Sequence, residues 1–436
     1  MGMKLLRAMA LASLSVFTTT AFVVATPSFA ADKSDKKAEG PKISKAFSKP
    51  LAEANKALTA KDWAAALTAL KTAEGISGAT DYESWIIHYY MTLAYYNSGD
   101  KKSAVDAIVK AVAAKDVPEQ NHMDALNLGM SLVSETQEPA KVIEFAKTYL
   151  PADAKMSDGV AHNLAFAYYQ VNDYKTALEY EKKSIDLAKA AGKVPPRGSY
   201  KLLQVCQSQL KDTAAVIATG EILARDYGAS EDWGQYIDFQ TGVMGTKGAK
   251  NKNLATAALY LYKLRVAINA DSKEADYQDA ADLAISQNLP NDAVVALESG
   301  LKNGAVTSAK AKASLAKAKK AVSVDLPTLV PADKAAEKSP KADPNVSVAA
   351  GYLSYNKFDD AIRVADRAIA KGGPRVNEAY LVKGVAEALQ GKPTATETLA
   401  KIKGDAVLEI AAHCWSVYAN RKVAAPAAAT AAPAAQ

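Results

Sequence analysis

Residues that could act as nucleophiles, general bases or metal ligands are few and widely separated in this sequence. The sequence contains no phosphate-binding loop and no GxGxxG, GxSxG, HExxH or CxxC motif. It therefore lacks the signature residues of common nucleotide-binding proteins, serine hydrolases, zinc proteases and dithiol oxidoreductases. A zinc site needs three or four converging ligands, yet the four histidines have no metal-ligand spacing: His88, His122, His162 and His413. The sequence therefore predicts no enzyme, no catalytic residue, no cofactor and no metal site.

The charge balance argues against a nucleic-acid partner. The chain has 53 basic and 47 acidic residues, a formal net charge of +6, whereas nucleic-acid binding proteins carry a concentrated basic patch. The most basic segment, 308–322, alternates alanine and lysine. We interpret it as a solvated helix flank with Leu315 and Val322 packed inward; the alternative is a membrane or polyanion patch.

Residues 1–30 have the pattern of a signal peptide. Lys4 and Arg7 accompany an apolar stretch at 5–24, and a small-x-small cleavage site follows at 28–30. Threonines interrupt the apolar stretch, so no integral membrane span is expected after the signal is removed; a retained anchor is the alternative. We expect export to the periplasm of a Gram-negative cell, with a mature chain that begins at Ala31.

The stretch 158–192 contains the clearest structural signal, two short helices joined by a tight turn. The first helix has an apolar stripe at helical spacing, formed by Val160, Leu164, Tyr168 and Val171. Asn172 and Asp173 then interrupt the pattern with turn-forming side chains, and the second helix ends at Gly192. A hairpin this short cannot bury both apolar faces alone, so it must stack on neighbouring hairpins.

This stretch resembles the tetratricopeptide repeat (TPR). The family pattern has a small residue and an aromatic in the first helix, an Asp-Tyr turn, and Ala-Leu-Glu-Tyr in the second helix. The matching residues are Leu164, Ala165, Tyr168, Asp173, Tyr174, Ala177, Leu178, Glu179 and Tyr180. Glu181 and Ser184 depart from it, because the family usually has an aromatic and an alanine there. The resemblance implies an all-α, TPR-like α-solenoid of about nine antiparallel helical hairpins.

Weaker copies of the hairpin recur on both sides. The turn acids Asp62, Asp100, Asp173 and Asp212 are 38, 73 and 39 residues apart, so the period is slightly above the 34 residues of the family. The expected organisation is a signal peptide (1–30), a flexible leader (31–44), N-terminal TPR-like repeats (45–228), irregular helical repeats (229–323), a linker loop (324–344), C-terminal TPR-like repeats with a capping helix (345–420) and a disordered Ala/Pro tail (421–436).

The two cysteines, Cys206 and Cys414, fall about six repeats apart in this register. Because repeats in a solenoid touch only their neighbours, these cysteines cannot approach within the roughly 7 Å between Cα atoms that a disulfide needs. We therefore predict that both are small, buried core residues.

The resemblance also implies where a partner binds, because partners of TPR proteins usually lie on the concave face of the first helices. The corresponding residues here are Tyr89, Leu93, Tyr96, Asn97, His162, Phe166, Tyr169, Gln170, Lys201, Val205 and Gln209. Aromatic rings there could stack on an extended peptide while amides bond its backbone. The alternative is that Tyr96 and Tyr169 only pack against the next repeat. Phe166 and Val205 replace the asparagines of the family's carboxylate clamp, so capture of a chain terminus is not implied.

The leading hypothesis for the function is a non-enzymatic periplasmic scaffold of the cell envelope that binds a protein or peptide segment in the concave groove. The alternative is a solute-, glycan- or peptidoglycan-binding helical protein, in which the tyrosine-rich groove holds a sugar. Some envelope proteins that this chain resembles accompany TonB-type energy transduction, so TonB-type transport machinery is a candidate partner.

Overall fold

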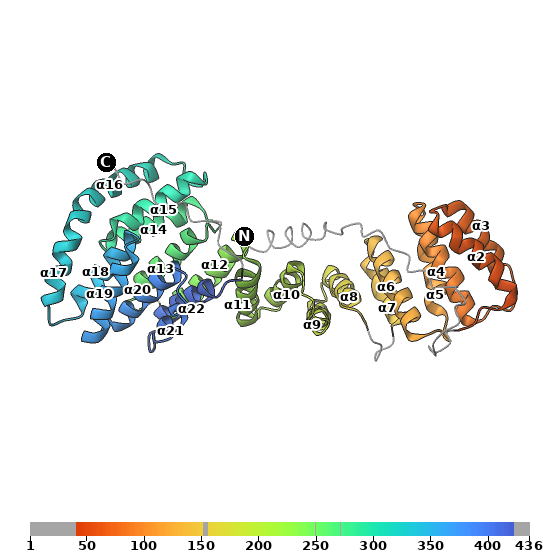
Figure 1. Cartoon of the computed structure of the whole chain (residues 1–436). Coiled ribbons are helices and arrows are strands. Elements are labelled where there is room, and N and C mark those ends of the chain that lie inside the picture. Colours follow the sequence, from red (N-terminus) through yellow and green to blue (C-terminus); the bar gives the residue numbers. More distant parts are fainter. Residues whose placement is uncertain (1–40, 151–155, 249, 271, 423–436) are drawn as a thin grey trace. The chain divides into compact units, whose positions relative to one another are not determined.

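The computed structural model describes residues 41–150, 156–248, 250–270 and 272–422 (Figure 1). Every regular element in these ranges is helical, which confirms the all-α prediction. The described ranges contain no helix that has both the length and the apolar character to cross a bilayer. The predicted signal peptide, the leader up to residue 40 and the tail after residue 422 lie outside the described residues.

The chain divides into two compact units, residues 1–213 and 214–436. The division falls at the start of helix α11 (Thr213–Ile222). The fifth predicted hairpin is therefore shared between the units, whereas the sequence placed the end of the N-terminal repeats at residue 228.

Unit 1 consists of consecutive helical hairpins, each packed on the next. The pairs are α2 (Lys45–Thr59) with α3 (Trp63–Glu74), α4 (Asp81–Asn97) with α5 (Lys101–Ala113), α6 (Glu119–Glu135) with α7 (Pro139–Tyr149), and α8 (Asp158–Gln170) with α9 (Tyr174–Ala190), followed by α10 (Arg197–Gln209). This sequential packing of antiparallel pairs is the predicted solenoid.

The recurring turn acids cap the second helix of these hairpins. Asp62, Asp100 and Asp173 each precede a second helix and accept a hydrogen bond from a backbone N–H in its first turn, at 3.0, 3.0 and 3.1 Å. The residue before each acid has a positive φ, as at Gly99 and Asn172 (91° and 63°), residue types that tolerate the left-handed conformation. A left-handed residue followed by a capping aspartate therefore reverses the chain between the paired helices.

Unit 2 continues with hairpins but is less regular. After α11 and a short π-helical turn (Leu223–Tyr227) come α12 (Ser230–Gly248), α13 (Leu254–Ala267), α14 (Glu274–Ser286), α15 (Pro290–Lys302), α16 (Ala309–Asp325), a 3-10 turn (Leu326–Thr328), α17 (Leu329–Lys338), α18 (Asp343–Ser354), α19 (Phe358–Lys371), α20 (Val376–Leu389), α21 (Ala395–Leu399) and α22 (Ala406–Ala419). The predicted helices at 254–268 and 308–322 and the hairpin at 274–303 are all present.

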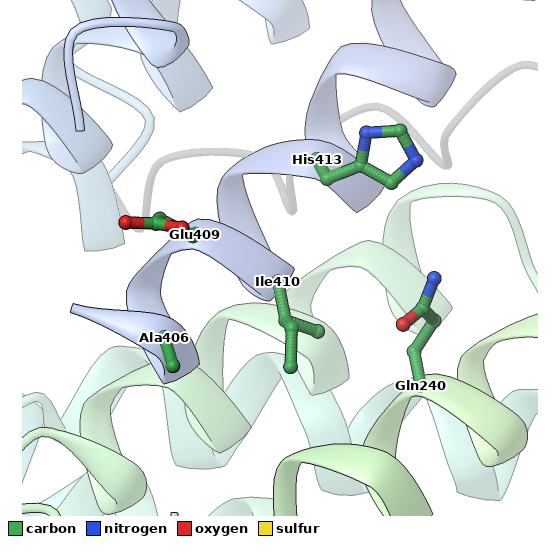
Figure 2. A pocket seen from close by; sticks show the side chains of 5 residues that line it. All are labelled: Gln240, Ala406, Glu409, Ile410 and His413. Atoms are coloured by element: carbon green, nitrogen blue, oxygen red, sulfur yellow. The ribbon is translucent and has the colours of Figure 1, made fainter. Parts of the chain in front are cut away.

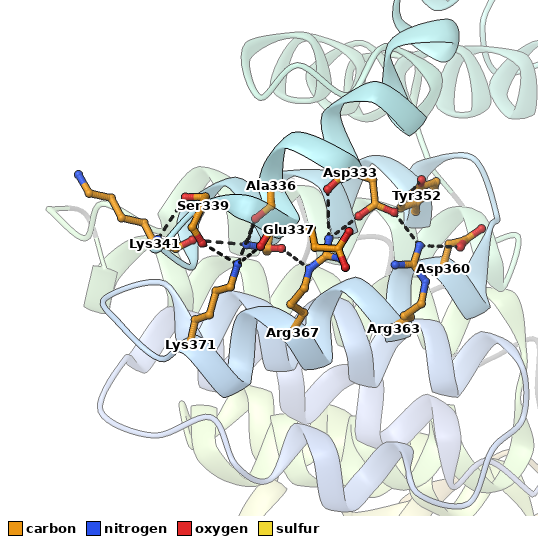
Figure 3. Close-up of polar contacts among 11 residues, drawn as sticks. Asp333, Ala336, Glu337, Ser339, Lys341, Tyr352, Asp360, Arg363, Arg367 and Lys371 are labelled. Carbon is orange, nitrogen blue, oxygen red and sulfur yellow. Dashed lines mark hydrogen bonds and ion pairs between the residues drawn. The ribbon is translucent and has the colours of Figure 1, made fainter.

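The segment 324–344 is not a linker loop, because it contains α17. Pro331 lies in the first turn of that helix, where proline is tolerated. Leu329 and Ala336 are buried, and the Asp333 carboxylate accepts hydrogen bonds from two arginines of α19, Arg363 (2.6 Å) and Arg367 (Figure 3). The proline and lysine content indicated a loop, but distant arginines stabilise a helix there.

Helix α22 is not a terminal cap either. It packs against α12 and α13 as well as against α20 and α21, so the last helix of unit 2 contacts the first ones. Trp415, which is fully buried, donates its indole N–H to the carbonyl oxygen of Tyr260 at 3.0 Å. The predicted disordered tail also begins with structure, since the Lys422 backbone N–H donates to the Arg225 carbonyl oxygen at 2.9 Å.

Candidate protein-binding surface

The second hairpin carries a stack of three aromatic rings on α4. Tyr82, Trp85 and Tyr89 follow one another at i, i+3 and i+7, which places them on one helix face. Their ring centroids lie 5.9 and 4.9 Å apart and adjacent planes are within 17° of parallel. Trp85 is buried while the two tyrosines are half-buried, and burial raises the pKa of Tyr89 to about 12, assisted by the charge of Asp124. Tyr89 is thus a partly exposed end of this stack.

The other predicted residues of α4 have three different environments. The Tyr96 hydroxyl donates to a carboxylate oxygen of Glu135 at 2.9 Å, so this half-buried ring links the second hairpin to helix α6 of the third. Leu93 is only 4% exposed and belongs to the core. Asn97 is exposed, and its side-chain N–H donates to the Leu93 carbonyl oxygen at 2.7 Å.

The fourth hairpin holds a histidine–carboxylate pair. Nδ1 of His162 lies 3.0 Å from a carboxylate oxygen of Glu181, whose side chain is completely buried. Burial disfavours the charged imidazolium, but the hydrogen bond and charge of Glu181 outweigh it, so the pKa of His162 is raised. Burial raises the pKa of the Cys206 thiol to about 12, and the Glu181 charge adds to that shift. Glu181 departs from the repeat pattern because it is the partner of His162.

A second aromatic cluster surrounds the turn between α8 and α9. Phe166 and Tyr169 are separated by 6.1 Å between ring centroids, and Tyr169 and Tyr174 by 5.9 Å. All three rings are half-buried, and the neighbouring Gln170 is exposed. Tyr174 was expected as a turn residue of the repeat and not as a partner-binding residue, although it directly follows the turn aspartate.

Helix α10 is largely buried. Lys201 and Val205 are 8% and 4% exposed, and Gln209 is half-buried. Cys206 on the same helix and Cys414 on α22 are both buried free thiols, as predicted. The predicted residues of α10 therefore offer little surface, in contrast to those of α4 and α8.

The predicted aromatic residues lie on two hairpins of unit 1. Tyr89 and Tyr96 belong to hairpin α4–α5, and Phe166 and Tyr169 to hairpin α8–α9. Hairpin α6–α7 lies between these two in the packing order. Both hairpins show the same arrangement: a half-buried tyrosine and an exposed amide occupy the last turn of the first helix, Tyr96–Asn97 in α4 and Tyr169–Gln170 in α8.

A cavity in unit 2 was not predicted. It has a volume of about 260 Å³ and is lined by Gln240 of α12 and by Ala406, Glu409, Ile410 and His413 of α22 (Figure 2). Nε2 of His413 lies 2.8 Å from a carboxylate oxygen of Glu221, and this hydrogen bond raises the pKa of His413. The helices that form the cavity are more than 150 residues apart in sequence, so no local pattern indicates it.

The described part of the chain contains no group of three or more His, Cys, Asp or Glu side chains that could hold a metal ion. His162 and His413 each contact one carboxylate.

No protein-family profile matches the chain, and no curated protein is similar to it at a significant level. Several solved structures are similar to it at low levels. A tetratricopeptide repeat protein from Parabacteroides merdae has 12% identity and a TM-score of 0.34, covering 63% of this chain and 100% of that one. Yeast Tom70 has 13% identity and a TM-score of 0.23, covering 82% and 84%. The Cut9–Hcn1 hetero-tetramer of the APC/C has 12% identity and a TM-score of 0.27, covering 84% and 66%.

The repeat residues and the hairpin geometry give the fold assignment independently of these scores. Antiparallel helix pairs stack in sequence order, small residues such as Ala165 lie at the helix contacts, and capping aspartates such as Asp173 recur at the turns. The described part of the chain is therefore all-α, and its stacked hairpins resemble the tetratricopeptide repeat.

Proposed function

We propose that this protein is a non-enzymatic interaction scaffold of the cell envelope that binds an extended protein segment on the first-helix surface of unit 1. One observation carries the proposal: the tyrosine–amide pair at the end of α4, Tyr96–Asn97, recurs at the end of α8 as Tyr169–Gln170.

This arrangement suits an extended peptide. Half-buried rings are held by packing on one side, so they offer a rigid apolar face at low entropic cost. An exposed amide beside each ring can donate to and accept from a peptide backbone, which provides affinity with little dependence on the partner's sequence. Two such pairs in hairpins two repeats apart would engage a segment along its length.

Export to the periplasm is part of the proposal. Its support is the basic start, apolar stretch and cleavage site of residues 1–30. N-terminal sequencing of the protein from an envelope fraction should return Ala31 as the first residue. A sequence that starts at Met1 would contradict removal of the signal.

Site-specific photo-crosslinking tests the surface in intact cells. A benzophenone amino acid at the exposed positions Asn97 and Gln170 should form crosslinks to a polypeptide. The control positions Lys102 of α5 and Glu179 of α9 are also exposed but belong to the second helices. Equal yields at all four positions would contradict the proposed surface. Adducts to glycan alone would favour the sugar-binding alternative.

A further inference from the structure

Three large apolar side chains are exposed at the junction of α16 and α17. Val324, Leu326 and Val330 are 69%, 42% and 52% exposed. They fall within seven residues, at the end of α16, in the 3-10 turn and at the start of α17. We call the outward surface of residues 309–338 the α16–α17 corner. Exposed apolar residues this close together in the chain, rather than scattered singly, indicate a surface that contacts something other than water.

Lysines surround these apolar side chains. Lys317 and Lys320 precede Val324 by seven and four residues on α16, and Lys334 follows Val330 by four residues on α17, so each shares a helix face with an exposed valine. The exposed lysines of the corner are Lys310, Lys312, Lys317, Lys319, Lys320, Lys334 and Lys338. Among the described contacts, only Lys319 of this set forms an ion pair, with the half-buried Glu298 at 2.7 Å.

The acids of the corner do little to offset this charge. Asp333 is 8% exposed and engaged by Arg363 and Arg367 beneath α17. Asp325 accepts a hydrogen bond from the Tyr355 hydroxyl at 2.7 Å. Glu337 is the remaining acid and lies 3.9 Å from Arg367. The outward surface is therefore strongly positive.

The packing fixes which face points outward. Ala311, Leu315 and Ala318 of α16 are buried, which leaves its lysine face towards solvent. The Asp333–arginine contacts hold the opposite side of α17 against α19, and Lys371 donates to the carbonyl oxygens of Ala336 and Ser339 at 3.1 and 2.7 Å (Figure 3). These contacts leave the lysines and the exposed apolar side chains on the solvent side of α16 and α17.

We infer that the α16–α17 corner binds the surface of an anionic phospholipid bilayer. Lysines around a few protruding aliphatic side chains can contact lipid headgroups while the valines and leucine enter the interface. The exposed basic residues are all lysines, hydrated and flexible point charges that suit a diffuse layer of anions. A specific carboxylate partner would instead favour arginine with its fixed geometry, and the arginines here are engaged in internal ion pairs.

Vesicle co-sedimentation with the full-length chain tests this inference. Vesicles of phosphatidylglycerol and phosphatidylcholine should bind the protein, and vesicles of phosphatidylcholine alone should bind it at least tenfold less. Binding should fall as NaCl rises from 0.05 to 0.5 M, because salt screens exposed charges. The quadruple variant Lys317→Gln/Lys320→Gln/Lys334→Gln/Lys338→Gln should bind at least tenfold more weakly.

Matched variants test whether vesicle binding depends on the α16–α17 corner itself. The alternatives are the total charge of the protein and its apolar N-terminal stretch, which every variant retains. Lys71→Gln/Lys102→Gln/Lys182→Gln/Lys183→Gln changes the net charge equally, at exposed lysines of unit 1, and should leave vesicle binding unchanged. Val324→Ser/Val330→Ser should weaken binding several-fold. Val171→Ser/Val194→Ser, at valines 44% and 83% exposed, should not.

The inference is overturned if the corner variants bind vesicles as tightly as the parent chain. It is also overturned if soluble polyglutamate binds the corner as well as anionic vesicles do and Val324→Ser/Val330→Ser leaves vesicle binding intact. That second result would assign the corner to an acidic polypeptide. Circular dichroism melts should confirm that every variant is folded, since all the substituted side chains are exposed.

Discussion

Trp415 and Tyr260 are joined by a buried hydrogen bond that spans 155 residues of sequence, from the indole N–H to the backbone carbonyl oxygen at 3.0 Å. Both side chains are nearly inaccessible, at 0% and 3% exposure. Nearby, the Asn253 amide donates to the Asp405 carboxylate at 2.7 Å. Unit 2 therefore closes its end onto its beginning, unlike an open solenoid in which only sequential repeats touch.

Removal of the Trp415 side chain should destabilise unit 2 strongly. Trp415→Ala leaves a cavity between α22 and α13 and should lower the free energy of unfolding by about 3–5 kcal/mol. Trp415→Phe keeps most of the packing and removes only the indole N–H donor. The Tyr260 carbonyl lies inside α13 and keeps its helical hydrogen bond, so the cost should be about 0.5–1.5 kcal/mol. Urea unfolding followed by circular dichroism measures both. The half-buried Trp63 of unit 1 provides a control, and an equal loss from Trp63→Ala would contradict a special role for the closure.

Gly129 should tolerate no side chain. A Cβ atom built at this position lies 2.5 Å from Cζ of Phe145 on the paired helix α7, so Gly129→Ala forces the hairpin apart and should cost about 1–3 kcal/mol. Phe145→Leu in the same chain should recover part of that loss, because it shortens the opposing side chain. At Gly159 of α8 the nearest atom is 3.8 Å away, so Gly159→Ala should be neutral or slightly stabilising. Independent, additive effects at 129 and 145 would refute the steric explanation.

The parts of the fold that depend on local signals could be predicted from sequence. Turn acids such as Asp100 and Asp173 identify hairpins because their roles are set by neighbours within a few positions. The helix α17 and the position of α22 could not be predicted this way. They depend on Asp333 meeting Arg363 and Arg367 some 30 residues later, and on Trp415 meeting Tyr260.

The candidate site was also predictable only in part. Its aromatic residues on α4 and α8 were identified from their positions in the repeat. Their exposure could not be predicted, because Leu93 and Lys201 occupy equivalent positions and are buried. The pairing of His162 with Glu181 could not be predicted either. Glu181 stands where the repeat normally has an aromatic residue, and the sequence does not show which side chain it contacts.

The His162–Glu181 pair should make stability depend on pH. The folded-state pKa of His162 lies above the unfolded value of about 6.5. The contribution of the pair is therefore fully present below pH 6.5 and lost as pH rises through the folded-state pKa. The difference in unfolding free energy between the parent and His162→Gln should shrink between pH 6 and pH 9. A difference that stays constant over this range would show that the imidazole does not change its charge.

The two tyrosines next to the exposed amides provide the test that does not require a known partner. Tyr96 and Tyr169 are half-buried, whereas Tyr90 on the same helix as Tyr96 is 2% exposed. Truncation of a buried aromatic costs about 3–5 kcal/mol of folding stability, so Tyr90→Ala sets the scale. Tyr96→Ala should cost less, about 1–2 kcal/mol, because the ring is half-buried and its hydrogen bond to Glu135 lies at the surface.

The same substitutions should have the opposite ranking in binding. Once a crosslinked partner is identified, Tyr96→Ala and Tyr169→Ala should each weaken its affinity by about 2 kcal/mol or more, as at other aromatic hot spots. Tyr96→Phe keeps the ring and loses only the hydroxyl, so it should retain most of the affinity if stacking provides the binding energy. If the melting temperatures of Tyr96→Ala and Tyr169→Ala fall as far as that of Tyr90→Ala, both rings act as packing between repeats. The partner must then bind elsewhere, because a side chain whose removal unfolds the hairpin is not held available for a ligand.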